Sequence, residues 1–243
     1  YYNKFMNFVQ VAIPSPLRQT FTYKNQFSSD LIGKRVLVEF GRRKLVGIVI
    51  SQSKNFDENY KLKQIDEVLD DSPLFDKQAL KKIINIANYY MHPIGIVFES
   101  FIPSFLRKAK HQKTLEKYVI KIDSDKAIKS LHTLTRDQKN ALNSIESNDS
   151  GEILLSGITS SGKTEVYKHF IKKLLKKGKS ALVLVPEIFL TPQIFNDFQE
   201  TFGNKVLLNH SGLTPVQRIK VWLASQDNKP KICLLYTSPS PRD

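Results

Sequence analysis

The stretch GITSSGKT, residues 157–164, decides the fold of the second half of this chain. It matches the pattern G-x-x-x-x-G-K-[S/T] in full. In such a loop, which leaves a strand and enters a helix, successive backbone N–H groups converge on a phosphate chain, and the two glycines permit the necessary backbone angles. The pattern therefore predicts a nucleotide-binding loop, with a plain glycine turn as the alternative.

The predicted loop gives its residues roles in binding ATP and Mg²⁺. Lys163 is expected to reach the β- and γ-phosphates and the Thr164 hydroxyl to ligate Mg²⁺, which makes these two the candidate catalytic residues. The helix that begins near Lys163 directs its positive end toward the same anion. The candidate nucleotide-binding residues in this stretch are Gly157, Ile158, Thr159, Ser160, Ser161, Gly162, Lys163, Thr164 and Glu165.

The sequence around the loop alternates between strand and helix signals. Strands are predicted at 152–156, 181–185 and 206–208. A helix is predicted over 163–177, and two more begin at Thr191–Pro192 and Thr214–Pro215, where a threonine N-cap precedes a proline at the first helical position. Such compact repeats predict a parallel sheet covered on both faces.

Gln138 and the segment 191–193 are candidate ligand contacts outside the loop. Gln138 follows Thr135 by three residues, so a capping box explains it. Spacing alone favours this over the alternative that Gln138 hydrogen-bonds an adenine, and both roles are compatible. Thr191, Pro192 and Gln193 follow the second predicted strand, at the edge where α/β sheets bind ligands. The N–H groups there suit a nucleic-acid phosphate, and plain helix capping is the alternative.

The first half of the chain has the signals of a small β-barrel. Residues 36–40 and 45–50 alternate as strands and flank the segment GRRK, 41–44, which predicts a β-hairpin with a basic tip. Short strands with glycine and proline between them are typical of such barrels. A helix is predicted over 76–91. The residues expected to pack in the core at the end of this helix are Tyr89, Tyr90 and His92.

The charge of the chain predicts a polyanionic partner. Lys and Arg number 37 against 23 Asp and Glu, giving a formal net charge of +14 on 243 residues. Both halves carry the excess, so nucleic acid is the expected partner, and a lysine-rich composition without a partner is the alternative. No apolar run is long enough to cross a membrane and no secretory leader is visible, so we expect a cytoplasmic protein. The single cysteine, Cys233, excludes an internal disulfide and a cysteine-ligated metal centre within the sequence.

Several motifs resemble the primosomal protein N′ family, the PriA-type replication-restart DNA helicases of bacteria. Those in the second half are GITSSGKTEVY (157–167), LVPEIFLTPQ (184–193) and HSGL (210–213). Those in the first half are VAIPSPL (11–17), TFTY (20–23), VEFGRRK (38–44) and YYMHPIG (89–95). The resemblance implies an α/β multidomain protein in which a 3′-end DNA-binding domain precedes a partial RecA-like lobe of superfamily 2. It also implies an ATP-dependent 3′→5′ helicase that recognises stalled or abandoned forks and initiates primosome assembly, with primosome and single-strand-binding proteins as partners.

The resemblance also assigns roles to individual residues. Gln138 is expected to read adenine. The residues expected to contact fork or single-stranded DNA are Phe21, Thr22, Tyr23, Gly41, Arg42, Arg43, Lys63, Thr191, Pro192 and Gln193. The family has an acidic residue, which contacts the terminal 3′-hydroxyl, where Thr22 stands here. Because a hydroxyl accepts hydrogen bonds less strongly than a carboxylate, this departure puts selectivity for a 3′-hydroxyl in doubt.

The resemblance predicts the domain boundaries as well. The 3′-end DNA-binding domain is expected over 6–107, and a linker over 108–130 leaves the family's winged helix absent or reduced. A truncated helicase lobe is expected over 131–232. Residues 233–243 turn rich in serine and proline and are expected to be a non-native tail.

The family's acidic motif that positions Mg²⁺ and water, its second lobe and its zinc-binding cysteines have no counterpart in the sequence. We therefore expect an N-terminal fragment that binds ATP and DNA without hydrolysing ATP alone, with zinc expected only in the full-length family. A non-enzymatic DNA-binding module is one alternative. Another P-loop enzyme, such as a small-molecule kinase, is a second, although no arginine-rich lid segment is found.

Overall fold

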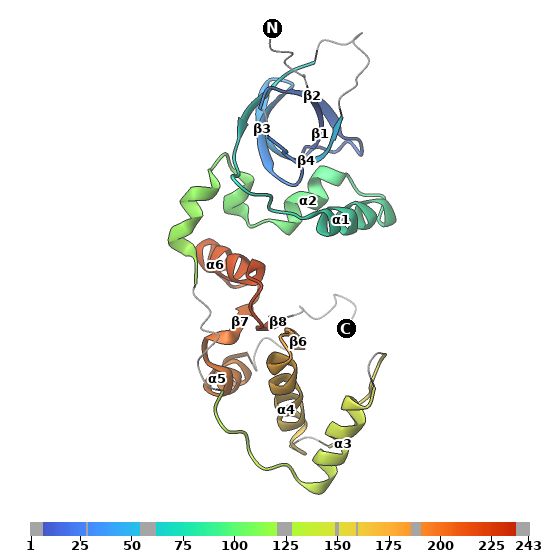
Figure 1. Ribbon diagram of the computed structural model, residues 1–243, viewed down its shortest axis with the longest axis vertical. Coiled ribbons are helices and arrows are strands. Elements are labelled where there is room, and N and C mark those ends of the chain that lie inside the picture. The colour runs from blue at the N-terminus through green and yellow to red at the C-terminus, as the bar shows by residue number, and fades with distance from the viewer. Residues whose placement is uncertain are drawn as a thin grey trace. The chain divides into compact units, whose positions relative to one another are not determined.

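The chain divides into two compact units in the computed structural model (Figure 1), Tyr1–Tyr118 and Val119–Asp243. The structure describes residues 7–27, 29–53, 62–120, 128–148, 151–158, 160–185 and 191–236. The boundary between the units lies inside the predicted linker. Among the described residues, no helix has both the length and the apolar character that crossing a membrane requires.

The first unit contains a curled antiparallel sheet of five strands. These are β1 (Asn7–Ala12), β2 (Phe21–Asn25), β3 (Arg35–Phe40), β4 (Arg43–Ser53) and β5 (Ile65–Val68). They lie in the order β2-β1-β4-β3-β5, and Figure 1 shows the sheet curling round on itself. Its two edges meet where the Lys24 amide donates to the Lys63 carbonyl over 2.9 Å. The predicted barrel-like architecture is thus confirmed as a curled, antiparallel sheet.

The predicted hairpin is confirmed with a shorter tip. Phe40 pairs with Arg43 across the β3–β4 ladder, so only two residues form the turn, and Arg43 and Lys44 already belong to β4. Gly41 has a φ of 60°, which a glycine adopts without strain. The basic side chains of Arg42, Arg43 and Lys44 are exposed, as the sequence predicts.

Two helices follow the sheet. The predicted helix is α1 (Lys77–Tyr89), whose N-cap Asp76 accepts a hydrogen bond from the Ala79 amide over 2.7 Å. Helix α2 (Ile94–Phe101) was not predicted. A Cβ added to Gly95 would lie 1.8 Å from the Ile13 carbonyl oxygen, so α2 packs on this part of the sheet only because residue 95 is glycine.

The prediction that Tyr89 and Tyr90 pack in the core is wrong. Their exposed fractions are 81% and 71%, because α1 buries the face that carries Leu80, Ile83 and Ala87 instead. His92 is exposed as well. Helical periodicity locates a buried stripe, and this stripe packs against α2, while the two tyrosines at the end of the helix lie outside it.

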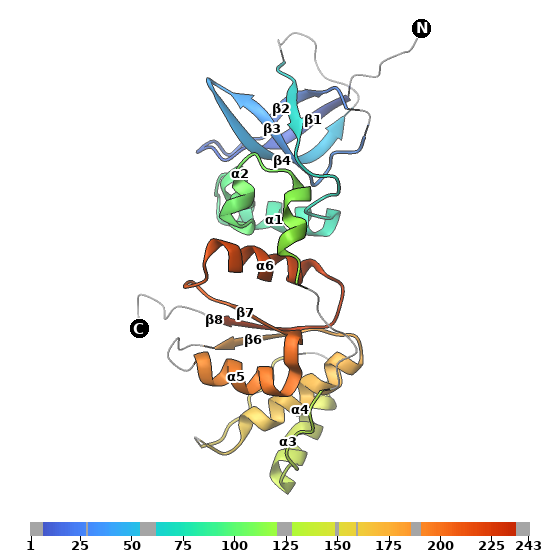
Figure 2. The ribbon, with the colours of Figure 1, turned by 90° about the vertical axis from the view of Figure 1, so that its left-hand side faces the viewer.

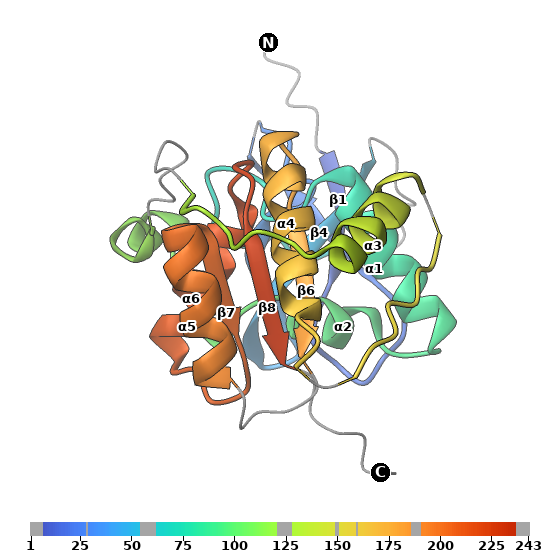
Figure 3. The ribbon, with the colours of Figure 1, turned by 90° about the horizontal axis from the view of Figure 1, so that it is seen from below.

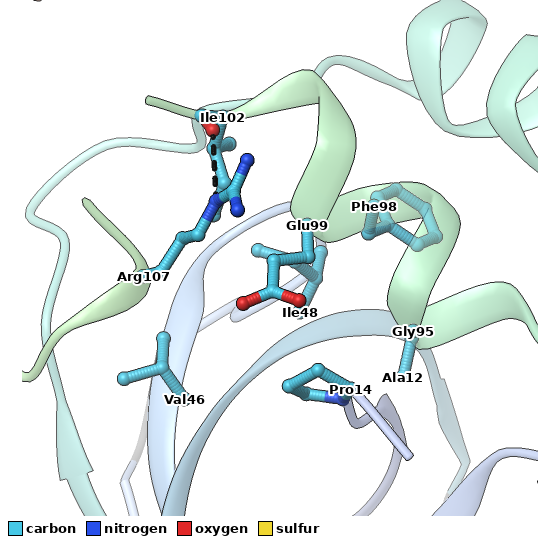
Figure 4. A pocket seen from close by; sticks show the side chains of 9 residues that line it. All are labelled: Ala12, Pro14, Val46, Ile48, Gly95, Phe98, Glu99, Ile102 and Arg107. Carbon is cyan, nitrogen blue, oxygen red and sulfur yellow. Dashed lines mark hydrogen bonds between the residues drawn. The ribbon is translucent and has the colours of Figure 1, made fainter. Parts of the chain in front are cut away.

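A small cavity lies between α2 and the sheet (Figure 4). Glu99 and Arg107 flank it, and Arg107 Nε donates to the Ile102 carbonyl over 3.3 Å. Its volume of about 20 Å³ holds little more than one water molecule, so it is not a ligand site.

The first part of the predicted linker belongs to the first unit. Two 3₁₀ helices, η1 (Ser104–Arg107) and η2 (Gln112–Tyr118), follow α2. The fully buried Arg35 pairs with Asp70 at 2.5 Å and donates to the Leu106 carbonyl over 2.8 Å. The Gln112 amide donates to the Leu69 carbonyl over 2.9 Å. These contacts extend the first unit from the predicted end at 107 to Tyr118.

The second unit is a three-layer α/β arrangement. Its elements are α3 (Arg136–Glu146), α4 (Lys163–Lys176), β6 (Ala181–Val185), α5 (Thr191–Phe202), η4 (Gly203–Lys205), β7 (Val206–Asn209), α6 (Pro215–Gln226) and β8 (Ile232–Tyr236). The strands are parallel in the order β6-β8-β7, as Figure 3 shows. Helices α4 and α5 cover one face and α6 lies on the other (Figure 2). The predicted parallel sheet with helices on both faces is confirmed, although Leu182 and Leu184 of β6 stay exposed.

The sequence prediction differs from this sheet in two places. The strand predicted at 152–156 is wrong, because residues 151–158 have no regular secondary structure and Leu154 is 92% exposed. A strand requires a hydrogen-bonded neighbour, and the described ladders of this sheet join only β6, β7 and β8. In addition, β8 extends past the predicted end of the lobe at 232, and its Leu234 is fully buried.

Candidate nucleotide and DNA sites

The predicted nucleotide loop closes around its own lysine. Lys163 is the first residue of α4, and its Nζ donates to the carbonyls of Gly157 and Ile158 over 2.7 and 2.8 Å. Ser160 and Gly162 have left-handed φ values of 62° and 77°, which turn the backbone into the helix. The N-cap residue of α4 is Gly162, which has no side chain to accept a hydrogen bond from the first N–H groups of the helix. This arrangement suits a phosphate chain.

Gln138 forms the predicted cap and also lies beside the loop. The capping box with Thr135 is confirmed. The same side chain donates from Nε2 to the Ser161 carbonyl over 3.1 Å. A Cβ on Gly162 would lie 2.3 Å from Gln138 Nε2, so a side chain at residue 162 would displace the end of the Gln138 side chain. The predicted contact with adenine stays a prediction.

The other predicted nucleotide-binding residues lie in α4 or outside the described residues. Thr164 is exposed and Glu165 is partly buried, both in the first turn of α4. Thr159 lies outside the described residues. Within the part of the chain that the structure describes, no group of three or more His, Cys, Asp or Glu side chains is placed to hold a metal ion. The predicted contact between the Thr164 hydroxyl and Mg²⁺ stays a prediction.

The predicted DNA segment at 191–193 forms the first turn of α5. Pro192 and Gln193 are exposed. The segment follows the carboxyl end of β6 in the chain, and the intervening residues 186–190 lie outside the described ones. The side chain of Thr191 is likewise not described. The predicted helix is confirmed, although it begins at Thr191 itself rather than at Pro192, and its DNA contact stays a prediction.

In the first unit, three of the predicted DNA-binding residues lie close together, namely Tyr23, Gly41 and Lys63. Lys63 Nζ donates to the Gly41 carbonyl over 3.1 Å and to Glu39 Oε1 over 2.7 Å. The Tyr23 hydroxyl donates to the Glu39 carbonyl over 3.0 Å. Nearby, the rings of Phe21 and Phe40 pack edge to face, with their centroids 4.8 Å apart. We call Tyr23, Glu39, Gly41 and Lys63 the Lys63 cluster.

Glu39 is the member of this cluster that the sequence prediction missed. It stands in the quoted motif VEFGRRK, but its role depends on Lys63, which is far away in the sequence. The hydrogen bond and the charge of Lys63 lower the pKa of the Glu39 carboxyl. Burial, together with the Glu39 charge, raises the pKa of Tyr23 to about 12. The cluster therefore contains a carboxylate and a protonated phenol at neutral pH.

Thr22 lies on the other face of β2. Side chains alternate along a strand, and Tyr23 points into the core, so Thr22 points away from it. Its hydroxyl accepts a hydrogen bond from Gln10 Nε2 over 2.8 Å. The Thr22 hydroxyl is therefore not part of the Lys63 cluster.

Both units match known protein families. Residues 10–103 match the family described as 3'DNA-binding domain (3'BD). Residues 131–236 match the family described as type III restriction enzyme, res subunit. The two matches follow the division of the chain into its first and second units.

Curated relatives match along most of the chain. The replication restart protein PriA of Treponema pallidum is 31% identical over 225 residues, which cover 88% of this chain and 33% of that protein. The PriA protein of Haemophilus influenzae is 31% identical, covering 89% of this chain and 40% of that protein. The PriA protein of Bacillus subtilis is 50% identical over 93 residues. The chain spans a third or so of the length of the first relatives, and it belongs to the replication restart protein PriA family.

Proposed function

We propose that this chain is the ATP- and DNA-binding part of a replication-restart helicase that moves 3′→5′ along DNA and acts at stalled or abandoned forks. The observation that supports this most directly is the closed loop around Lys163 at the uncapped start of α4. The Lys63 cluster, in the unit that matches a 3′-DNA-binding domain, supports the DNA-binding half of the proposal. Primosome and single-strand-binding proteins are the proposed partners.

In this proposal ATP replaces the loop's own carbonyls as the partner of Lys163. The ammonium group leaves the carbonyls of Gly157 and Ile158 for the β- and γ-phosphates, which bind a cation more strongly than neutral carbonyls do. The N–H groups at the start of α4 hold the same phosphates. The Thr164 hydroxyl ligates Mg²⁺, which neutralises phosphate charge when it is bound. Gln138 lies beside the loop, where it orients the base.

The Lys63 cluster holds the 3′ end of a DNA strand in this proposal. The Lys63 ammonium binds a phosphate near the end, and the Glu39 carboxylate accepts a hydrogen bond from the terminal 3′-hydroxyl. The exposed cations of the hairpin tip, Arg42 and Arg43, attract the backbone. Glu39 thereby supplies a carboxylate from β3, whereas position 22 carries none.

The test of the nucleotide site is the affinity of the chain for a fluorescent ATP analogue with Mg²⁺. Lys163→Ala is expected to weaken binding at least 100-fold while DNA affinity changes less than twofold. Lys173→Ala is the matched control, because Lys173 is an exposed lysine of the same helix that pairs with Glu146 at 2.5 Å. Unchanged ATP affinity in Lys163→Ala would sink the proposed nucleotide site.

A further inference from the structure

A buried lysine joins the loop helix α4 to α5. Lys168 is only 3% exposed. Its Nζ lies 3.2 Å from Glu165 Oε1, one turn earlier on α4, and it also forms an ion pair with Asp197 Oδ1 on α5. The ring of Phe198, also on α5, lies beneath the same ammonium group, with its centroid 6.0 Å away. One cation therefore holds two carboxylates that come from two helices.

The burial of this group is not explained by stability alone. Removing an ammonium group from water is unfavourable, and an apolar side chain in a similar space is often neutral or stabilising. Glu165 Oε2 is buried and has no hydrogen-bond partner among the described residues, so the contacts of Glu165 Oε1 with Lys168 decide how this carboxylate is held. What the ion pairs of this buried lysine do provide is a fixed geometry between α4 and α5.

Both ends of this link lie next to the proposed ligand contacts of the second unit. Glu165 directly follows Thr164, the proposed Mg²⁺ ligand. Asp197 lies in the second turn of α5, and the first turn of that helix holds the proposed DNA segment 191–193. If the start of α4 moves toward bound phosphates, the Lys168 side chain would therefore transmit that movement to α5.

We propose that Lys168 is a positioning residue that couples ATP binding at the loop to DNA binding at the start of α5. The inference rests on the proposed function, because it takes both ligands from there. When ATP orders the start of α4, Glu165 and Lys168 hold α5 in the position that binds a DNA backbone. The coupling is reciprocal, so DNA raises the affinity for ATP by the same factor.

The experiment measures the dissociation constant of the ATP analogue without DNA and with saturating single-stranded oligo-dT, using the whole chain. We expect DNA to tighten ATP binding about fivefold or more in the unaltered protein, which is the lower end of typical coupling. In Lys168→Met this ratio is expected to fall below two, while the affinity for ATP alone changes less than threefold. Lys173→Met, which removes an exposed ion pair on the same helix, is expected to keep the full ratio.

Two further variants keep the test decisive if Lys168→Met does not fold. Asp197→Asn removes the α5 end of the link at a half-exposed side chain, and it is expected to lower the ratio at least twofold. Lys168→Arg keeps a cation between the two carboxylates, and it is expected to retain most of the ratio. A merely structural role for Lys168 would change the stability of the second unit without changing this ratio.

The outcomes separate the two proposals. Failure of the unaltered chain to bind ATP or DNA would overturn the proposed function and the coupling with it. Normal binding of both ligands with a ratio near one, or an unchanged ratio in Lys168→Met and Asp197→Asn, would overturn the coupling and leave the proposed function intact.

Discussion

The two units organise their candidate sites in different ways. In the first unit the sheet curls until its edges meet at Lys24 and Lys63, and the Lys63 cluster sits where they meet. In the second unit the sheet keeps apolar side chains of β6 exposed, with Leu182 at 63% and Leu184 at 57%. The candidate DNA site of the first unit is therefore formed by strand pairing. The candidate sites of the second unit depend on a loop and on the first turns of α4 and α5.

This difference predicts that the first unit can be destabilised without affecting the second. Asp70→Ala leaves the fully buried Arg35 guanidinium without its carboxylate, which is expected to lower the free energy of unfolding by about 3–5 kcal/mol. Trp222, the single tryptophan, lies on α6 in the second unit. In a denaturant titration followed by circular dichroism, the unfolding transition of the first unit should shift to lower denaturant concentration. The transition followed by Trp222 fluorescence should not shift.

Glu67→Ala is the control for this experiment. Glu67 pairs with His111 at 2.8 Å, but both side chains are about half exposed, so the expected change is below about 1 kcal/mol. Equal shifts of the Trp222 transition and the circular dichroism transition in Asp70→Ala would show that the units do not unfold independently.

A smaller effect is expected where α2 packs on the sheet. In Gly95→Ala the new Cβ meets the backbone of Ile13, and overpacking of this kind destabilises by about 1–3 kcal/mol. Gly41→Ala tests the backbone angle alone, because a Cβ there meets nothing within 4 Å while φ is +60°. The melting temperatures of the two variants separate the effect of the steric contact at residue 95 from the effect of backbone strain at residue 41. A Gly95→Ala variant that is more stable than the unaltered chain would contradict the packing of α2.

The Lys63 cluster predicts an effect on binding rather than on folding. Glu39→Gln removes the charge that would accept a hydrogen bond from a 3′-hydroxyl, so the preference for a 3′-hydroxyl over a 3′-phosphate end is expected to fall about fivefold. Asp66→Asn is the matched control, since Asp66 pairs with Lys44 at 3.2 Å in the same unit. Fluorescence anisotropy with both oligonucleotides measures the preference. An identical preference in Glu39→Gln and the unaltered chain would remove Glu39 from the site.

The smallest expected effect concerns alkaline pH. The pKa of Tyr23 is raised from 10.0 to about 12, so the contribution of its protonated hydroxyl is complete below pH 10 and is lost as the pH rises toward 12. Tyr23→Phe cannot ionise at this position, and it is expected to lose less stability between pH 10 and 12 than the unaltered chain. Circular dichroism in denaturant at several pH values checks this, and parallel losses in both proteins would contradict the assignment.

Local chemistry made much of the fold predictable from sequence. The caps at Thr135 and Thr214, the helix that begins at Lys163 and the hairpin tip at Gly41 all depend on residues a few positions apart. Such signals need no knowledge of the distant chain. For the same reason, the residues of the nucleotide loop could be named before their positions were known.

The features that sequence reasoning missed depend on distant partners. Arg35 donates to the carbonyl of Leu106 in η1, 71 residues later, and Glu39 pairs with Lys63, 24 residues later. Residues 152–156 have the composition of a strand but lack a pairing partner in the described sheet, whereas β8 gains two partners and extends past the predicted end of the lobe. In each of these cases, contacts between segments that are far apart in the sequence determine the structure.

The central claim, that each unit carries its own ligand site, is tested most directly by measuring ATP and 3′-ended DNA binding on the same three proteins. Lys163→Ala is expected to lose ATP binding and keep DNA binding. Lys63→Ala is expected to lose about tenfold in affinity for DNA with a free 3′ end and to bind ATP as the unaltered chain does. Loss of both ligands in either variant, or loss of neither, would contradict two separate sites.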